Sequence, residues 1–224
     1  MFRQVGFMPS LYLDTTGNLC AGILAEDGQH WLAWKTVAAQ KTSAVIYPLL
    51  HDLLEQQHLK LAEVSTFYYV AGPGSYTGMR LAEGLAQIVR WKIPVRSFYH
   101  FAVPGLLGQS SGLWLCSAFK QEYFVYQWQD QQHTTQLYKM TALKEVLDQA
   151  VAKKSAIYTH FATLLPELAP WKVFLQETSS LVYQHPQFLQ EISPEQMAGP
   201  YYFRGLEQEF KQEKVPTFNK AVLK

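Results

Sequence analysis

The stretch Tyr69-Val-Ala-Gly-Pro-Gly-Ser-Tyr-Thr-Gly-Met-Arg-Leu-Ala-Glu-Gly84 decides the fold. It is typical of a buried strand, a glycine-rich turn over residues 72–78 and a helix over residues 77–91. Its three glycines in seven residues let backbone amides converge at the N-terminus of the helix, which favours an anion there. The turn lacks the Gly-Lys-Ser/Thr of a P-loop and the glycine spacing of a dinucleotide fold. Two interpretations stay open: a purely structural turn, and a phosphate or carboxylate site formed by Gly72, Gly74, Ser75, Thr77, Gly78 and Arg80.

Upstream of this turn, the pattern predicts three short strands at 11–14, 19–25 and 30–35, joined by polar turns that contain glycine. A helix over 43–57 follows, because apolar residues recur at helical spacing and Thr42 or Ser43 can cap its start. Strands are expected at 66–71 and 95–98, on either side of the helix over 77–91. The first half therefore has the order βββαβαβ.

The second half repeats this order in outline. Strands are expected at 113–119, 123–129 and 135–140, then a helix over 141–152, a strand at 156–160 and a helical segment over 161–168. The glycine- and serine-rich run 104–112 is interpreted as a linker between the halves. Residues 1–7 are assigned no role, and the tail after Gly199 is expected to be ordered only in part.

A second candidate site is the turn between the first two strands, which contains Asp14, Thr15 and Thr16. A carboxylate and hydroxyls at a hairpin tip could hold the phosphates of a nucleotide and a metal ion. The same residue types are also those that favour such a turn for its own sake. Both interpretations stay open at this point.

Composition and charge narrow the class of protein. The chain has 224 residues, of which 48% are hydrophobic and 17% charged, so it can bury a sizeable core. Its formal net charge of +1 gives no overall attraction to nucleic acid or to an anionic membrane. The apolar runs are shorter than the ~20 residues of a membrane span, and the start lacks the apolar region of a secretion signal, which predicts a cytoplasmic protein. Cys20 and Cys116 are expected to be small buried side chains rather than a disulfide or a zinc site.

Four motifs together resemble the TsaB family, also called YeaZ. They are Asp14-Thr15-Thr16, Ile46-Tyr47-Pro48-Leu49-Leu50-His51-Asp52-Leu53-Leu54, Gly72-Pro73-Gly74-Ser75-Tyr76-Thr77-Gly78-Met79-Arg80 and Pro200-Tyr201-Tyr202-Phe203-Arg204. The resemblance is strong over residues 8–104 and weaker beyond, and the glycine-rich string is its specific part.

The resemblance implies an α/β fold of two actin-like lobes, in the ASKHA or ribonuclease H-like class, with duplicated βββαβα units and mixed sheets. The lobes would span residues 8–104 and 105–204, followed by a tail over 205–224. The implied role lies in making N6-threonylcarbamoyladenosine (t6A) in tRNAs that read codons beginning with A.

In that pathway the family is a non-catalytic paralogue of the transferase TsaD. It pairs with and supports that transferase, and the pair engages the P-loop ATPase TsaE. The resemblance therefore implies no cofactor of the chain's own, ATP or ADP only in the complex, and indirect contact with tRNA. A homodimer through the same surface is also open.

Catalytic residues are not expected. The transferase carries a His-x-Glu-Gly-His metal motif after its Ile-Pro strand, whereas the corresponding positions here are His100, Ala102 and Pro104. One imidazole does not hold a metal ion alone, so no metal site is predicted and His100 is interpreted as a surface or packing histidine. The family's Asp-Ala-Arg in the second half is replaced by Ser117-Ala118-Phe119-Lys120, so a carboxylate of an actin-like ATP site is missing. The alternative is a stand-alone actin-like ATP-binding phosphotransferase or a degenerate metallopeptidase that uses Asp14 and the turn 72–78.

The two helices of the first half are predicted to form a partner surface. The first carries more leucines than one sheet contact needs, and the second has an apolar face beside a row of small residues. Two such helices from each of two paralogues could form a four-helix bundle, whereas burial of the pair within one domain is the alternative. The predicted interface residues are Ile46, Leu49, Leu50, Leu53, Leu54, Gly78, Ala82, Leu85, Ala86 and Val89.

Overall fold

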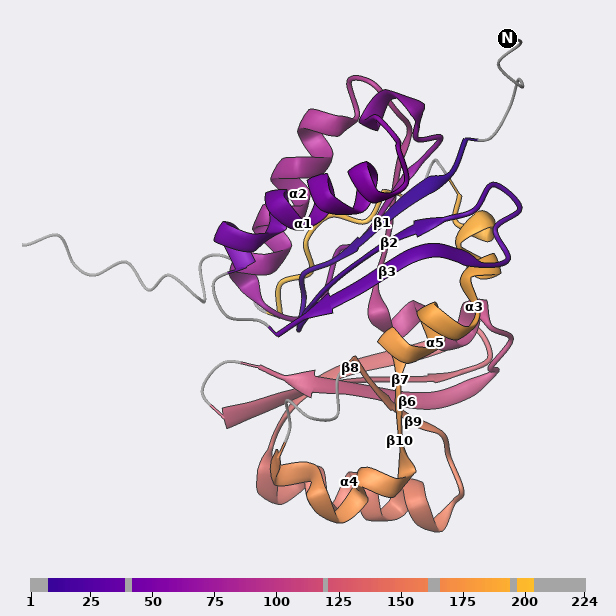
Figure 1. The fold of residues 1–224 in the computed structure, drawn as a ribbon. Helices are drawn as coiled ribbons and strands as arrows, with labels where there is room; N and C mark the ends of the chain where they lie inside the picture. The colour runs from indigo at the N-terminus through magenta and orange to yellow at the C-terminus, as the bar shows by residue number, and fades with distance from the viewer. Residues whose placement is uncertain (1–7, 39–41, 119–120, 161–165, 194–196, 204–224) are drawn as a thin grey trace, which may run out of the picture.

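The computed structural model describes residues 8–38, 42–118, 121–160, 166–193 and 197–203. They form two lobes, each built on a five-stranded mixed sheet (Figure 1). Residues 1–7, most of the tail and part of the predicted helical segment 161–168 lie outside the described residues. Within the described residues, no helix combines the length and apolar character that a bilayer span requires.

The first lobe contains the predicted strands and helices of the first half. Its strands are β1 (Ser10–Asp14), β2 (Leu19–Leu24), β3 (Trp31–Val37), β4 (Phe67–Val70) and β5 (Val95–Phe98), in the order β3-β2-β1-β4-β5. The pairs β1–β2 and β2–β3 are antiparallel, whereas β1–β4 and β4–β5 are parallel. Helices α1 (Thr42–Gln56) and α2 (Tyr76–Val89) lie together on one face of this sheet (Figure 1).

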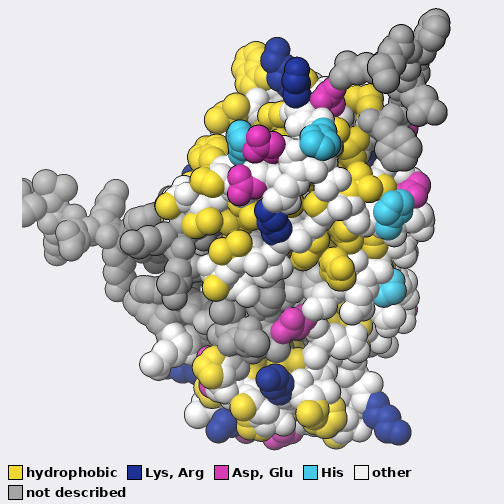
Figure 2. Space-filling model, viewed as in Figure 1, with side chains coloured by type: hydrophobic (Ala, Val, Ile, Leu, Met, Phe, Trp, Pro, Cys, Tyr) yellow, Lys and Arg dark blue, Asp and Glu magenta, His cyan; other side chains and the backbone are white. Residues whose placement is uncertain are grey.

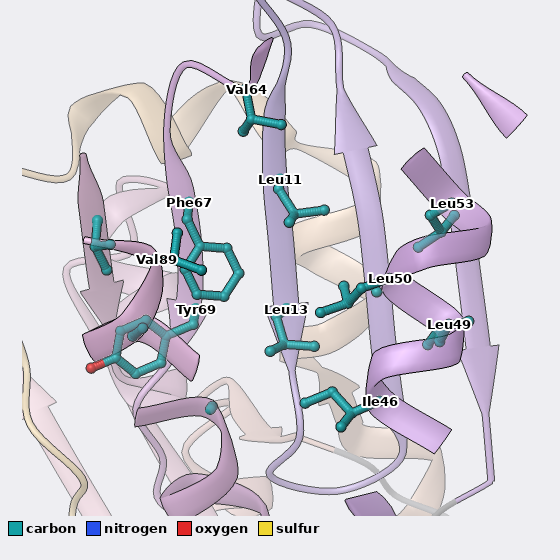
Figure 3. Packing of buried hydrophobic residues seen from close by; sticks show 14 of the residues in the cluster. Leu11, Leu13, Ile46, Leu49, Leu50, Leu53, Val64, Phe67, Tyr69 and Val89 are labelled. Atoms are coloured by element: carbon teal, nitrogen blue, oxygen red, sulfur yellow. The ribbon is translucent and has the colours of Figure 1, made fainter. Parts of the chain in front are cut away.

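The core of the first lobe lies between this helix pair and the sheet. Apolar side chains of α1 point towards Leu11 and Leu13 of β1, and those of α2 pack beside Phe67 and Tyr69 of β4 (Figure 3). Leu53 and Phe67 are completely buried. The helical periodicity of the sequence therefore marks the face that packs on the sheet.

The second lobe repeats the sheet with different strand lengths. Its strands are β6 (Ser111–Ser117), β7 (Glu122–Gln129), β8 (Gln132–Lys139), β9 (Ile157–Thr159) and β10 (Leu175–Glu177), in the order β10-β9-β6-β7-β8. Helix α4 (Met140–Ala152) covers one face, and a 3-10 helix over Pro166–Phe174 leads into β10. The predicted linker 104–112 is wrong in part, because α3 (Val103–Leu106) occupies its start and β6 begins at Ser111.

The C-terminal part of the chain returns to the first lobe, which the predicted lobe boundaries did not include. Helix α5 (Thr178–Gln184) and a 3-10 helix over Pro186–Glu191 place Val182 and Phe188 in one buried cluster with Val70 and Phe98. These elements cover the face of the first sheet opposite α1 and α2 (Figure 1). Residues 105–204 therefore do not form a separate lobe, because their last part completes the core of the other one.

Residues 198–203, which include most of the last family-like motif, run across the junction of the lobes. The amide of Tyr201 donates to the carbonyl of Ala71 at 2.9 Å, and the hydroxyl of Ser97 donates to the carbonyl of Ala198 at 2.8 Å. The Tyr201 ring contacts Phe101 and Phe124, at centroid distances of 5.3 Å each. This segment thus joins the end of the first sheet to the aromatic face of the second. Arg204 of the same motif lies outside the described residues.

Candidate functional site

The turn after β1 is buried, and one oxygen of its Asp14 carboxylate is hydrogen-bonded within the turn. Oδ1 of Asp14 accepts hydrogen bonds from the Thr16 amide at 2.8 Å and from the Thr16 hydroxyl at 2.7 Å. Asp14 and Thr15 have no exposed surface, and Thr16 is 2% exposed. These hydrogen bonds explain why Asp and Thr stand at this hairpin tip.

The glycine-rich turn packs directly on this buried turn. The Ser75 amide donates to the Thr16 carbonyl at 2.6 Å, and the Thr15 hydroxyl donates to the Gly78 carbonyl at 2.7 Å. A Cβ atom on Gly78 would lie 1.8 Å from the Thr15 carbonyl oxygen, and one on Gly74 would lie 2.4 Å from that of Thr16. Both glycines are therefore required because two backbones approach too closely for a side chain.

These contacts correct the predicted anion site. The side chain of Ser75 caps α2 by accepting the Gly78 amide at 3.2 Å, so this amide is already satisfied. Gly72 is buried, with φ of 113°, whereas Thr77 and Arg80 are exposed. The Arg80 guanidinium lies over the rings of Tyr76 and Tyr202. The predicted residues therefore do not form one site. The glycines lie at a backbone contact between the two turns, whereas Thr77 and Arg80 lie on the exposed surface of α2.

His100 completes a buried polar chain at the junction of the lobes. Its Nε2 atom lies 3.1 Å from Oδ2 of Asp14 and 2.8 Å from the Thr16 hydroxyl. Because the Thr16 hydroxyl donates to Asp14, Nε2 is the donor in the contact with Thr16. On the other side, Nδ1 lies 3.0 Å from the hydroxyl of Thr178, which donates to the carbonyl of Thr159 at 3.2 Å.

The chain Asp14–His100–Thr178 links both lobes. Asp14 ends β1, His100 follows β5, Thr178 begins α5, and the carbonyl that closes the chain belongs to β9. All three side chains have no exposed surface. The prediction that His100 lies at the surface is therefore wrong. The alternative prediction, that it packs inside the protein, is correct, and the buried ring also makes the polar contacts described above.

Electrostatics favour an ionised Asp14. Burial by itself raises the pKa of its carboxyl, but the charge of His100 and the hydrogen bonds from His100 and Thr16 outweigh burial and lower that pKa. His160 lies next to this pair, with its ring 5.4 Å from that of His100. Burial, followed by repulsion from His100, lowers the pKa of His160 to about 3. His160 is therefore neutral near pH 7 and adds no positive charge beside Asp14.

Both cysteines are free and buried, as predicted. Among the described residues, His51, Asp52 and Glu55 bring three ligand atoms within 4.8 Å of one another. These side chains are exposed on α1, and exposed acidic groups of this kind are common without a bound metal ion.

The structure also corrects the predicted partner surface. Most of the predicted interface side chains face their own sheet, and only Leu54 and Leu85 are partly exposed. The buried ones are Ile46, Leu49, Leu50, Leu53, Ala82, Ala86 and Val89, with Gly78 against Thr15. The excess of leucines on α1 reflects a sheet that two helices cover together rather than a partner.

A different set of apolar residues is exposed on the same two helices. Ile88 is 65% exposed, Tyr47 57% and Trp91, just after α2, 84%. We call this set, together with the exposed residues Ala44, Pro48 and Gly84, the outer helix face. Hydrophobic side chains gather at the surface over the α1 and α2 part of the molecule in Figure 2.

The two mixed sheets with their helices define a two-lobed α/β protein of the actin-like ATPase fold. The solved structure of an uncharacterized protein with similarity to peptidase YEAZ from Pseudomonas aeruginosa has the same fold. It superposes with a TM-score of 0.58 at 17% sequence identity, over 88% of this chain and 100% of that one.

Sequence comparison points to a particular family within this class. The chain is 30% identical over 80 residues to the tRNA threonylcarbamoyladenosine biosynthesis protein TsaB of Escherichia coli K12, which covers 36% of this chain and 34% of that protein. It is 29% identical over 77 residues to the TsaB protein of Buchnera aphidicola, and this aligned segment covers 34% of this chain and 34% of that protein. The matches thus span about a third of the length of these curated relatives, and no model of a known protein family matches the chain. They support the TsaB (YeaZ) family for this chain, as its motifs predicted.

Proposed function

We propose that this chain acts in the synthesis of t6A in tRNA as a non-catalytic subunit that binds and supports a TsaD-like transferase. The name of the curated relatives, a tRNA threonylcarbamoyladenosine biosynthesis protein, supports the pathway. The non-catalytic role and the partner are inferred from the geometry of the lobe junction and of the outer helix face.

The state of Asp14 is the observation that carries the non-catalytic role. In an actin-like ATP site, carboxylates from both lobes face the nucleotide and its metal ion. Here Asp14 is fully buried, one of its oxygens accepts two hydrogen bonds from Thr16, and the other lies beside His100. A phosphate or metal ion would have to separate this buried pair, and leaving one such charge uncompensated costs about 3–5 kcal/mol. At the corresponding edge of the second lobe, β6 ends at Ser117 rather than at a carboxylate.

The outer helix face is the surface we assign to the transferase. Ile88 and Trp91 are both exposed at the C-terminal end of α2, and large apolar side chains exposed in this way favour a protein interface, in which Trp is a frequent energetic centre. Gly84 gives α2 a smooth strip next to Ile88, since a Cβ atom there would meet no atom within 4 Å. A helix of the paralogous transferase could therefore approach α2 closely.

In this arrangement the transferase supplies the catalytic residues and the tRNA contacts, and a TsaE-like P-loop ATPase joins the pair. ATP or ADP would be bound in that complex, in the cytoplasm. The near-neutral net charge of +1 is consistent with a subunit that does not itself hold tRNA.

Co-expression with the TsaD-like paralogue of the same cell tests this proposal. Wild-type chain should recover the transferase in a 1:1 complex, and Ile88→Arg should lower the recovery about tenfold or more, since it places a charge in the interface. Val173→Arg is the matched control, because Val173 is 86% exposed in the second lobe. Equal recovery with Ile88→Arg and wild type would contradict the proposed interface. ATP hydrolysis by the isolated chain, abolished by Asp14→Asn in a folded variant, would contradict the non-catalytic role.

A further inference from the structure

A hollow of about 450 Å³ lies between the segment that follows β5 and the β7–β8 hairpin. One wall comes from residues 101–110, which contain α3, and the other from residues 126–133. Its volume is in the range of small-molecule sites, which runs from about 300 to 1,000 Å³. The described residues that line it include no member of the Asp14–His100–Thr178 chain or of the outer helix face, so the hollow is separate from both.

Two hydrogen bonds hold the walls of this hollow together. Nε1 of Trp128 donates to the Gln109 carbonyl at 3.0 Å, and the Asp130 amide donates to the Ser110 carbonyl at 2.6 Å. Each bond joins the chain after α3 to the end of the β7–β8 hairpin. Because the walls are fixed in this way, the hollow is formed before any ligand binds, which lowers the entropic cost of binding.

Aromatic rings line one side of the hollow. The rings of Phe101 and Tyr126 stack at 4.3 Å with an angle of 15° between their planes. The His133 ring stacks on Tyr126 at 5.2 Å with an angle of 22°, and the Trp128 ring lies 5.9 Å from Tyr126. Aromatic groups of this kind attract planar groups and cations.

The charge of the hollow favours a cation. Asp130 contributes an exposed carboxylate, and the described lining residues contain no lysine or arginine. Within the described parts of the chain, no salt bridge involves Asp130. A phosphate or carboxylate ligand would therefore meet a like charge and no compensating cation, whereas a positive group would find an available carboxylate.

The wall that contains α3 leaves room for a ligand. A Cβ atom on Gly105 or on Gly108 would meet no atom within 4 Å. Gly108 has φ of 83°, which favours glycine, whereas Gly105 lies in α3 without a positive φ. Gly105 can therefore be replaced by a larger residue that fills the hollow without backbone strain.

We propose that this hollow binds the guanidinium group of an arginine side chain in a peptide. The flat guanidinium can lie against aromatic rings, and its forked N–H groups can donate to both carboxylate oxygens of Asp130. Lysine has the charge without the planar fork, so the hollow should prefer arginine. The absence of a cation among the described lining residues favours arginine within a chain over free arginine, whose own carboxylate would find no partner.

This site goes beyond the proposed function and does not rest on it. It uses neither the outer helix face nor Asp14, so a failure of one proposal leaves the other intact.

Titration of the purified, ¹⁵N-labelled chain with Nα-acetyl-arginine amide, followed by NMR, tests the proposal. The Trp128 indole and Asp130 amide signals should shift with a dissociation constant of about 1–10 mM, and Nα-acetyl-lysine amide should bind about fivefold more weakly. Asp130→Asn should weaken binding about fivefold, as expected for one exposed charge pair, and Gly105→Leu should abolish it. Gly84→Leu is the matched control, because Gly84 also has no atom within 4 Å of its Cβ but lies on α2, and it should bind like wild type.

Several results would overturn the proposal. They are shifts that do not saturate by about 100 mM, equal affinity for the arginine and lysine amides, or unchanged binding by Asp130→Asn. Tighter binding of free arginine than of its blocked amide would overturn the assignment to a peptide. The amide spectrum of each variant shows whether it is folded.

Discussion

Replacing His100 with alanine should destabilise the protein strongly at pH 7. The substitution removes the group that lies 3.1 Å from Oδ2 of Asp14 and 2.8 Å from the Thr16 hydroxyl, and leaves the carboxylate in a site with no exposed surface. Breaking a buried charge pair in this way costs about 3–5 kcal/mol, a large part of the ~5–15 kcal/mol that stabilises a typical domain. The contact of Nδ1 with Thr178 is lost as well, which adds to the cost.

The stability difference between wild type and His100→Ala should depend on pH, and its direction follows from the pKa of Asp14. In the wild type the pKa of Asp14 is lowered, so the carboxylate contributes stability above its unfolded pKa of ~3.9, and this contribution is lost as the pH falls through the folded pKa. In His100→Ala burial is no longer outweighed, so the pKa of Asp14 should rise above its ordinary value. The variant then loses stability as the pH rises through this raised pKa. The difference between wild type and variant should therefore be largest at pH 7 and smaller near pH 4.

Urea unfolding followed by tryptophan fluorescence measures this difference, since Trp114 lies 6.2 Å from the His100 ring. The double variant Asp14→Asn/His100→Ala is the control, because a neutral amide in place of the carboxylate should recover part of the loss at pH 7. A loss below about 1 kcal/mol at pH 7, the scale of one ordinary hydrogen bond, would refute the assignment of a charged pair. A loss that increases as the pH is lowered would refute it as well.

Three further predictions concern packing. Gly78→Ala should cost about 1–3 kcal/mol or more, because its Cβ atom would lie 1.8 Å from the Thr15 carbonyl oxygen. Gly84→Ala, in the same helix with no atom within 4 Å of its Cβ, should instead stabilise by about 0.5–1 kcal/mol; equal effects of the two substitutions in urea unfolding would contradict the docked turns. Tyr201→Ala should cost about 1–3 kcal/mol, because the half-buried ring packs on Phe101 and Phe124 at the lobe junction, and unchanged thermal unfolding would show that residues 198–203 do not join the lobes.

Local patterns predicted most of the secondary structure. Strand and helix periods identified β1 to β5, α1, α2, β6 to β8 and α4, because these segments alternate or repeat over enough residues. The short strand β10 and helix α5 have three and seven residues and were missed. Their place on two different lobes depends on contacts with distant strands, which no local period reports.

The site was harder to predict, for a physical reason. Asp14 and the glycine-rich turn were each identified as unusual, but their packing depends on Thr15 meeting Gly78 across 63 residues. Without knowledge of this contact, the glycine-rich turn and the Asp14 carboxylate are equally consistent with a structural turn and with an anion or metal site. Thr178 and His160 lie in a part of the chain without a recognisable motif, so nothing in the sequence linked them to His100.

The prediction of the partner surface was wrong for a different reason, because most of the predicted interface residues are buried against their own sheet. On α1 the helical period located the face that covers the sheet, whereas on α2 the buried residues are mainly the small ones, Gly78, Ala82 and Ala86, together with Met79 and Val89. Ile88 near the end of α2 and Trp91 just after it are apolar but exposed, and they are the better signal for a partner. Helical period alone does not separate the apolar residues that pack on the sheet from those that stay exposed.

The central claim is that this chain promotes t6A synthesis by binding a transferase rather than by chemistry at Asp14. The most direct measurement is the t6A formed in purified tRNA by the TsaD-like transferase and its ATPase, with this chain omitted, added as wild type, or added as Ile88→Arg or Val173→Arg. The account predicts full t6A with wild type and Val173→Arg, and little with Ile88→Arg or without the chain. Equal t6A in all four reactions, or t6A formed by this chain without the transferase, would contradict it.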